Sequence, residues 1–77
     1  MSEEPILKAF GKKMYSLRIE LKLSQEQLAE RAQLDRTYVS SVERGQRNIS
    51  LLNICKLAAA LEVTPESLLA NLGEYYE

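Results

Sequence analysis

The segment from Ser24 to Gly45 carries the signals of two short helices joined by a tight turn. Ser24 followed by Gln27 matches a capping box, in which the hydroxyl accepts from the third helical N–H and the amide bonds back. Asp35 suits a helix start because its carboxylate caps free N–H groups and complements the helix dipole. Gly45 favours the left-handed conformation that ends a helix. The pattern therefore predicts a helix at about 25–32, a turn at 33–35 and a helix at about 36–44.

Apolar spacing predicts three further helices around this segment. Pro5 suits a first helical turn, and the apolar residues that follow it recur at helical spacing: Ile6, Phe10, Met14, Leu17 and Leu21. Ser50 caps a fourth helix, and Thr64 with Pro65 opens a fifth that runs through Leu72. The sequence thus predicts one all-α domain over residues 1–77, with helices at about 5–21, 25–32, 36–44 and, for the last two, within 50–72.

The composition excludes several classes of function. The chain has 77 residues, one cysteine and no histidine, so neither a disulfide within the chain nor a Cys/His zinc site is expected. Histidine-based acid–base chemistry is also absent, and we expect no enzyme, no metal and no cofactor. No run approaches the roughly 20 apolar residues of a membrane span, and no signal peptide is recognisable. We expect a cytoplasmic protein without a membrane partner.

Charge is distributed unevenly along the chain. The formal net charge is −1, yet all ten basic residues lie within residues 5–56. That span has only five acidic residues and so carries a net charge of +5. The other acidic residues lie toward the two ends: Glu3, Glu4, Glu62, Glu66, Glu74 and Glu77. Because affinity for DNA depends on neutralising phosphates, this asymmetry is compatible with one basic, DNA-facing surface.

Two short helices joined by a tight turn are typical of a helix-turn-helix, whose second helix enters the DNA major groove. We expect base contacts from the outward residues of that helix: Arg36, Thr37, Ser40 and Ser41. Arg36 stands out because a guanidinium near the helix start can donate two hydrogen bonds to guanine. The alternative is a solvated arginine paired with Asp35 or a carboxylate of the preceding helix.

A second group of residues suits contacts to the DNA backbone: Gln25, Tyr38, Arg44, Arg47 and Asn48. Gln25 lies at a helix N-terminus, where an amide and free N–H groups can meet a phosphate. Tyr38 has two alternatives, a phenol on a phosphate or a ring packed at the seam of the first two helices. For Arg44, Arg47 and Asn48 the alternative is a flexible basic loop that contacts nothing.

Other residues suit structural and assembly roles. Arg18 and Glu43 each lie beside apolar positions, so we expect an ion pair between the first and third helices. Six apolar or aromatic residues exceed the need of so small a core and suit a homodimer interface: Leu52, Cys55, Leu69, Leu72, Tyr75 and Tyr76. The alternative is that they close the core of a monomer, with Cys55 as a small apolar group.

Residues 23–50 resemble the Cro/C1-type (XRE) helix-turn-helix family. The resemblance rests on Leu-Ser-Gln-Glu-x-Leu-Ala from residue 23, Val-Ser-x-Val-Glu-Arg-Gly from residue 39 and the following Arg-Asn-x-Ser, and it extends over about 8–69. Within the family, the segments 34–40 and 43–48 look most like the controller proteins of restriction–modification systems. The ends depart from any family pattern, since Gly73 to Glu77 match none.

The resemblance implies a compact five-helix, lambda-repressor-like fold with the helix-turn-helix in its second and third helices. It implies a dimeric transcriptional regulator that binds paired operator sites in double-stranded DNA, upstream of its own gene and that of an endonuclease. It also implies base contacts at Arg36 and Thr37, an ion pair of Arg18 with Glu43, and dimerisation through the last two helices. Backbone or groove contacts are implied at Gln25, Tyr38, Arg44 and Arg47.

Alternative functions remain open on the sequence. A phage or mobile-element repressor has the same scaffold, and an antitoxin or other protein-interaction module would use it to hold a protein partner. RNA polymerase is a further candidate partner, through a small patch at Glu26, Glu30 or Gln33. Acidic residues at such positions are otherwise ordinary solvated groups.

Overall fold

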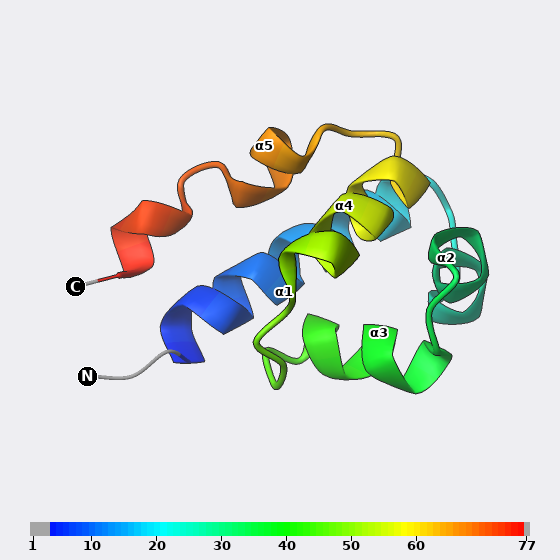
Figure 1. Cartoon of the computed structure of the whole chain (residues 1–77), viewed down its shortest axis with the longest axis horizontal. Helices are drawn as coiled ribbons and strands as arrows, with labels where there is room; N and C mark the ends of the chain where they lie inside the picture. The colour runs from blue at the N-terminus through cyan, green and yellow to red at the C-terminus, as the bar shows by residue number, and fades with distance from the viewer. Residues whose placement is uncertain (1–3, 77) are drawn as a thin grey trace.

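The computed structural model describes residues 4–76, and every regular element in that range is helical (Figure 1). Residues 1–3 and 77, with the acidic Glu3 and Glu77, lie outside the described residues. The elements are α1 (Glu4–Glu20), α2 (Gln25–Ala32), α3 (Arg36–Glu43), α4 (Leu51–Ala60), α5 (Pro65–Leu69) and a 3₁₀ turn, η1 (Leu72–Tyr75). The predicted all-α, five-helix fold is confirmed.

The caps explain why α2 and α3 begin where they do. The Gln27 N–H donates to Ser24 Oγ at 3.0 Å, and the Ser24 N–H donates to Gln27 Oε1 at 2.8 Å, which completes the capping box. Asp35 Oδ2 accepts from the Thr37 N–H at 2.9 Å. Gln33, between the two helices, has φ 59°, a left-handed conformation that ends α2 and turns the chain.

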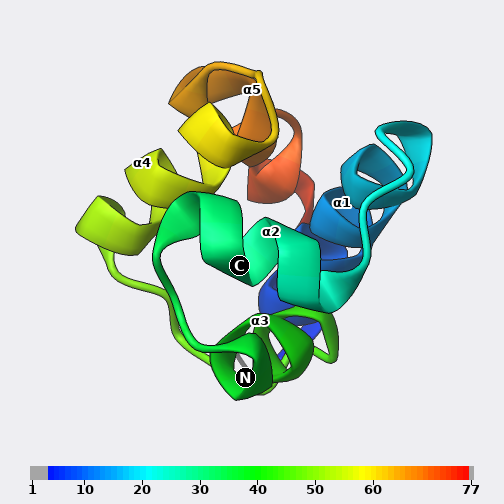
Figure 2. The same ribbon diagram turned by 90° about the vertical axis from the view of Figure 1, so that its right-hand side faces the viewer.

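The helices surround one apolar core. Met14, Leu28, Val39, Leu57 and Leu68 are fully buried, so each helix from α1 to α5 contributes a side chain to it. Helix α3 packs against α1 and α2, α4 packs against α2 and α5, and α5 and η1 pack against α1. Figure 2 shows α2 between α1 and α4, with α3 on the opposite side of the molecule from α5. None of the helices within residues 4–76 has the length and apolar character to cross a membrane.

Gly11 allows α1 and α3 to approach closely. A Cβ at this position would lie 2.5 Å from the carbonyl oxygens of both Val42 and Glu43, at the end of α3. Contacts that short do not occur, so only glycine permits this crossing. No local sequence pattern indicates this role for Gly11, because the contact joins residues far apart in the chain.

The last helix is shorter than the predicted 65–72. Helix α5 ends at Leu69, because Ala70 is extended (ψ 134°) and Asn71 is left-handed (φ 67°). Lys13 Nζ of α1 donates to the carbonyl oxygens of Ser67 at 3.2 Å and Ala70 at 3.1 Å. Lys13 thus provides hydrogen bonds to carbonyl oxygens that have no helical partner at the end of α5. The chain then continues as the 3₁₀ turn η1 and not as further α-helix. The other predicted boundaries agree with the structure to within one or two residues.

Candidate nucleic-acid interface

Arg36 and Thr37 are exposed in the first turn of α3. The capping of the Thr37 N–H by Asp35 fixes this turn, so both side chains leave the helix from a rigid backbone. Ser40, one turn further along, is partly buried and its Oγ accepts a hydrogen bond from Arg44 Nη1. Three of the four residues predicted to contact bases therefore retain some exposure.

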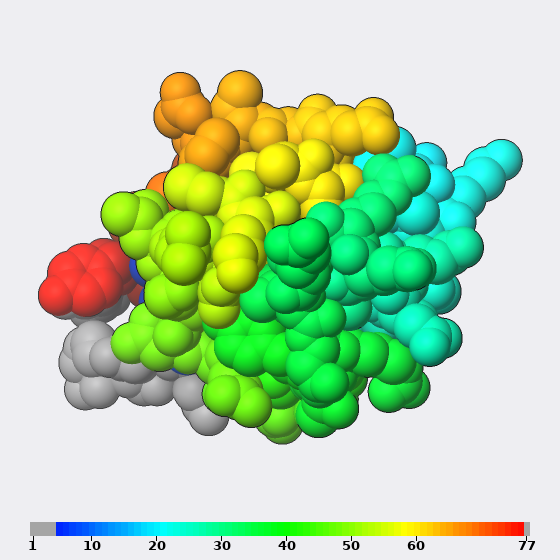
Figure 3. Space-filling view, turned by 45° about the vertical axis from the view of Figure 1, so that its right-hand side comes forward, coloured from blue at the N-terminus to red at the C-terminus, as the bar shows by residue number. Residues whose placement is uncertain are grey.

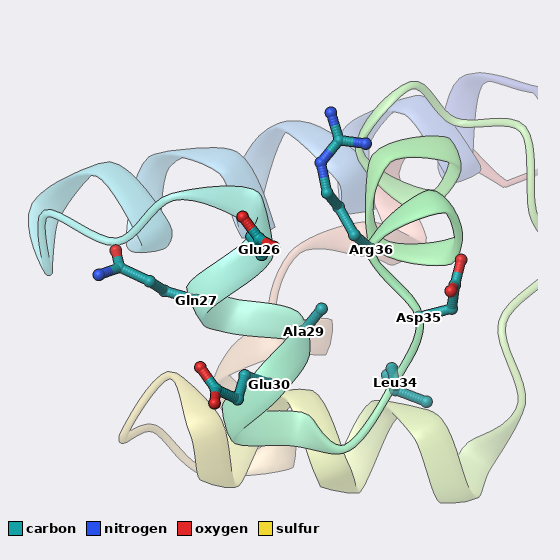
Figure 4. Close-up of a pocket in the computed structure, with 7 residues that line it drawn as sticks. All are labelled: Glu26, Gln27, Ala29, Glu30, Leu34, Asp35 and Arg36. Atoms are coloured by element: carbon teal, nitrogen blue, oxygen red, sulfur yellow. The ribbon is translucent and has the colours of Figure 1, made fainter.

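Arg36 lies on the rim of a furrow between α2 and α3. The furrow has a volume of about 540 Å³ and is lined by residues of both helices and of the turn: Glu26, Gln27, Ala29, Glu30, Leu34, Asp35 and Arg36 (Figure 4). Within residues 4–76, Arg36 has no ion pair and no side-chain hydrogen bond, with Asp35 or with α2. Arg36 is therefore not paired with Asp35 or with a carboxylate of α2 within residues 4–76. Its guanidinium N–H groups remain available.

The predicted outward orientation of Ser41 is wrong. Ser41 is buried, with 7% of its surface exposed. Its hydroxyl donates to the Tyr38 carbonyl oxygen at 2.9 Å and accepts from Arg47 Nε at 3.0 Å. Ser41 is therefore enclosed by neighbouring protein groups, and its hydroxyl is bonded to two of them.

The three predicted loop residues Arg44, Arg47 and Asn48 are exposed beside the C-terminal end of α3. Arg44 Nε and Nη2 donate to Gln46 Oε1 at 3.3 and 3.2 Å, and Nη1 to Ser40 Oγ. The guanidinium of Arg47 lies over the Tyr38 ring, 5.2 Å from its centroid, a distance typical of a cation–π contact. Both arginines are thus held against α3, and the alternative of a loop whose side chains contact nothing is wrong for this pair.

Tyr38 is partly buried against the core, and its hydroxyl accepts a hydrogen bond from Asn53 Nδ2 of α4 at 3.0 Å. Tyr38 therefore contacts α4 through its hydroxyl. Neither alternative drawn from the sequence, a phosphate contact or packing between the first two helices, included this contact. No local sequence pattern indicates this role for Asn53, because its contact with Tyr38 joins residues far apart in the chain. Its only sequence signal is a polar side chain in the first turn of a helix whose other residues, apart from Lys56, are apolar.

Gln25, Arg18 and Glu43 form one connected group. Arg18 Nε lies 2.7 Å from Glu43 Oε2, and Arg18 Nη2 donates to Glu43 Oε1 at 3.0 Å, which gives the expected ion pair. Gln25 Nε2 donates to the same Oε1 at 3.0 Å. The hydrogen bond to Glu43 raises the pKa of the Arg18 guanidinium above its ordinary value. The pair ties α1 to α3, and Gln25 is oriented by it.

The residues predicted for a dimer interface are largely exposed. Tyr76 is 69% exposed, Leu52 64%, Tyr75 47% and Leu69 41%. Cys55 is exposed, and Leu72 is partly buried. Leu51, which was not predicted for this interface, is 72% exposed. An apolar groove of about 190 Å³ brings Leu69 and Leu72 together with Ile54 of α4. These side chains exceed what the monomer core encloses, so the alternative that they close it is wrong for most of them.

Comparisons with known proteins show the family of this chain. The sequence profile of the helix-turn-helix family matches residues 14–68. Control protein C.MunI from Mycoplasma sp. is 47% identical over 64 residues, covering 82% of this chain and 86% of that protein. Control protein C.BamHI from Bacillus amyloliquefaciens is 49% identical over 61 residues, covering 78% of this chain and 75% of that protein.

The crystal structure of the restriction–modification controller protein C.AhdI from Aeromonas hydrophila superimposes with a TM-score of 0.79 at 55% identity, covering 80% of this chain and 94% of that one. The chain therefore belongs to the Cro/C1-type (XRE) helix-turn-helix family and is similar to the restriction–modification controller proteins within it.

Proposed function

We propose that this protein is a sequence-specific transcriptional regulator that binds a palindromic operator as a homodimer and controls restriction–modification genes, including its own. The observation that carries the proposal is the first turn of α3, where Arg36 and Thr37 are exposed and Arg36 has no partner among residues 4–76. The similarity to control proteins supports the choice of genes.

The proposed contacts divide into two kinds. Arg36, Thr37 and Ser40 would meet base edges in the major groove, because they are the accessible residues of α3 on its DNA-facing side. Gln25, Tyr38, Arg44, Arg47 and Asn48 would contact the sugar–phosphate backbone and fix the register of α3. Ser41 is left out of both groups, since its buried hydroxyl instead supports Arg47.

The charge distribution supports this orientation on DNA. Figures 1 and 2 place α5 on the opposite side of the molecule from α3. The acidic Glu62 and Glu66 lie just before and within α5, and Glu74 lies in η1. Glu66 is thus directed away from α3, and its repulsion of phosphates is weakened by distance and by salt.

A dimer has a physical motive and an available surface. One short helix contacts too few base pairs for a selective site, whereas two half-sites about 34–36 Å apart double the readout on one face of the duplex. The proposed surface comprises the exposed apolar and aromatic residues of α4, α5 and η1, with the partly buried Leu72 among them: Leu52, Cys55, Leu69, Leu72, Tyr75 and Tyr76. Burying them in a symmetric contact removes apolar surface from water.

RNA polymerase is proposed as a further partner if the regulator activates transcription. Glu26 and Glu30 are exposed on α2 and line the furrow beside Arg36. In transcription assays at an operator-bearing promoter, Glu30→Gln should reduce activation and leave operator affinity unchanged. Equal activation by this variant would remove Glu30 from the proposed contact.

A binding-site selection tests the proposed function. Purified protein is mixed with a random-sequence duplex library, and the bound duplexes are recovered, amplified and sequenced through several rounds. The proposal predicts enrichment of a site with twofold symmetry and half-sites about one helical turn apart. Recovery of duplexes with no common sequence would contradict it.

A further inference from the structure

A chain of contacts connects α4 to the loop that follows α3. Asn53 Nδ2 donates to Tyr38 Oη at 3.0 Å, and the Arg47 guanidinium lies 5.2 Å from the centroid of the Tyr38 ring. Arg47 Nε donates to Ser41 Oγ, which in turn donates to the Tyr38 carbonyl oxygen. Figure 3 shows the start of α4 beside α3 and the loop that connects them. A residue of α4 is therefore connected to two residues proposed to contact the DNA backbone.

The hydrogen bonds within this group determine which donors of Tyr38 and Arg47 remain free. A phenol has one O–H donor and accepts through its oxygen. Because Asn53 supplies the donor to Tyr38 Oη, the phenol proton is left to donate elsewhere, and the accepted bond polarises it for doing so. Arg47 uses only Nε within residues 4–76, so Nη1 and Nη2 keep their N–H groups. Both side chains thus have donors to offer to a phosphate.

We propose that Asn53 is a positioning residue for DNA recognition. Resting on the proposed DNA-binding function, this inference adds a residue of α4 that does not itself touch DNA. The Asn53 amide holds the Tyr38 ring in place, and the ring holds the Arg47 guanidinium beside the end of α3. Without the amide, Tyr38 and Arg47 must be ordered when DNA binds, and that ordering weakens binding.

A double-mutant cycle tests whether Asn53 acts through the Tyr38 hydroxyl. The affinity of the full chain for the duplex recovered by selection is measured for wild type, Asn53→Ala, Tyr38→Phe and the double variant. Each single variant should bind about threefold to tenfold more weakly, the range expected for one neutral hydrogen bond. Asn53→Ala should cause no further loss in the Tyr38→Phe background, because the hydroxyl that it held is absent.

A salt series and a control variant separate positioning from stability. The dependence of log affinity on log salt should become shallower in Asn53→Ala, since Arg47 engages phosphate less fully. Ser67→Ala is the matched control, because Ser67 occupies in α5 the place of Asn53 in α4: its N–H donates to the N-cap hydroxyl three residues earlier. Its affinity and salt dependence should equal those of wild type. If Asn53→Ala melts below the assay temperature, Asn53→Ser is used in its place. Serine is also neutral, and its side chain is too short to reach Tyr38.

The outcomes distinguish this inference from the proposed function. An equal loss from Asn53→Ala in the wild-type and Tyr38→Phe backgrounds would show that Asn53 acts independently of the hydroxyl and would overturn the inference alone. Unchanged affinity of Asn53→Ala would do the same. A wild-type protein that binds no duplex selectively would overturn both.

Discussion

Arg18 of α1 and Glu43, the last residue of α3, form a two-point contact in which Nε lies 2.7 Å from Oε2 and Nη2 donates to Oε1 at 3.0 Å. Only 9% and 6% of the two side chains are exposed. Arg18 Nη1 also donates to the Leu23 carbonyl oxygen at 2.8 Å, just before α2. One guanidinium therefore connects α1, the segment before α2 and the proposed recognition helix α3.

Arg18→Ala should destabilise the fold strongly. The substitution leaves the Glu43 carboxylate nearly buried without its cation, a change that costs about 3–5 kcal/mol in free energy of unfolding. Chemical denaturation of the two proteins measures it. Arg31→Ala is the control, because the Arg31–Glu62 pair is 45% and 65% exposed and should contribute less than about 1 kcal/mol. Equal losses from both variants would contradict the structural role of the Arg18–Glu43 pair.

Gly11→Ala should also destabilise the protein, although alanine is the better helix former. The new Cβ would lie 2.5 Å from two carbonyl oxygens of α3, so the helices must separate. Overpacking of this kind costs about 1–3 kcal/mol, which outweighs the gain of about 1 kcal/mol in helix propensity.

Thermal melting of Gly11→Ala and Gly73→Ala checks this, since a Cβ at Gly73 meets nothing within 4 Å. Gly11→Ala should melt lower than wild type by several degrees, and Gly73→Ala should melt close to wild type. A Gly11→Ala protein that melts higher than wild type would show that α1 and α3 do not approach this closely.

Local signals predicted most of the fold. The Ser24 and Asp35 caps begin α2 and α3, and the left-handed Gly45 (φ 76°) follows the end of α3. These signals act within a few residues, so the sequence alone places both helices. The end of α5 was predicted wrongly: the chain leaves the helix at Ala70, where Lys13, distant in the chain, donates to the Ser67 and Ala70 carbonyls. Such a contact leaves no local pattern.

The candidate site was predicted less completely than the fold. Helical spacing alone does not decide whether Ser41, at the border between the outward and inward faces of α3, is buried. The width of the buried stripe depends on how closely neighbouring segments pack against α3, and Ser41 is buried with its hydroxyl bonded to the Tyr38 carbonyl and to Arg47 of the following loop. Asn53 contacts Tyr38 from α4, outside the helix-turn-helix.

Leu52→Asp should convert the proposed dimer to a monomer. Leu52 is 64% exposed on α4, and a carboxylate buried in an apolar contact is desolvated without a partner. Sedimentation velocity over a range of protein concentrations measures the change. Ile19→Asp is the control, because Ile19 is 48% exposed on α1, outside the proposed interface, and this variant should remain dimeric. A wild-type protein that stays monomeric at all concentrations would contradict the proposed dimer.

Arg47→Ala should weaken binding to all duplexes by a similar factor. Arg47 is exposed beside the end of α3 and is held by Tyr38 and Ser41, a position suited to a phosphate contact. Removing one such contact should reduce the slope of log affinity against log salt by about 1 in each subunit. Titrations of selected and unrelated duplexes at several salt concentrations measure both effects. An unaltered slope would remove Arg47 from the backbone contacts.

The base preference of Arg36→Ala shows whether the first turn of α3 reads the DNA sequence. Arg36 is exposed in the first turn of α3 and has no partner within residues 4–76, so its loss should leave the fold intact. Binding-site selection with wild type and variant, alongside their melting curves, gives the measurement. The variant should lose base preference at one position of each half-site, with about 1–3 kcal/mol less discrimination there, and retain it elsewhere. An Arg36→Ala protein with the same preference as wild type at every position would contradict it.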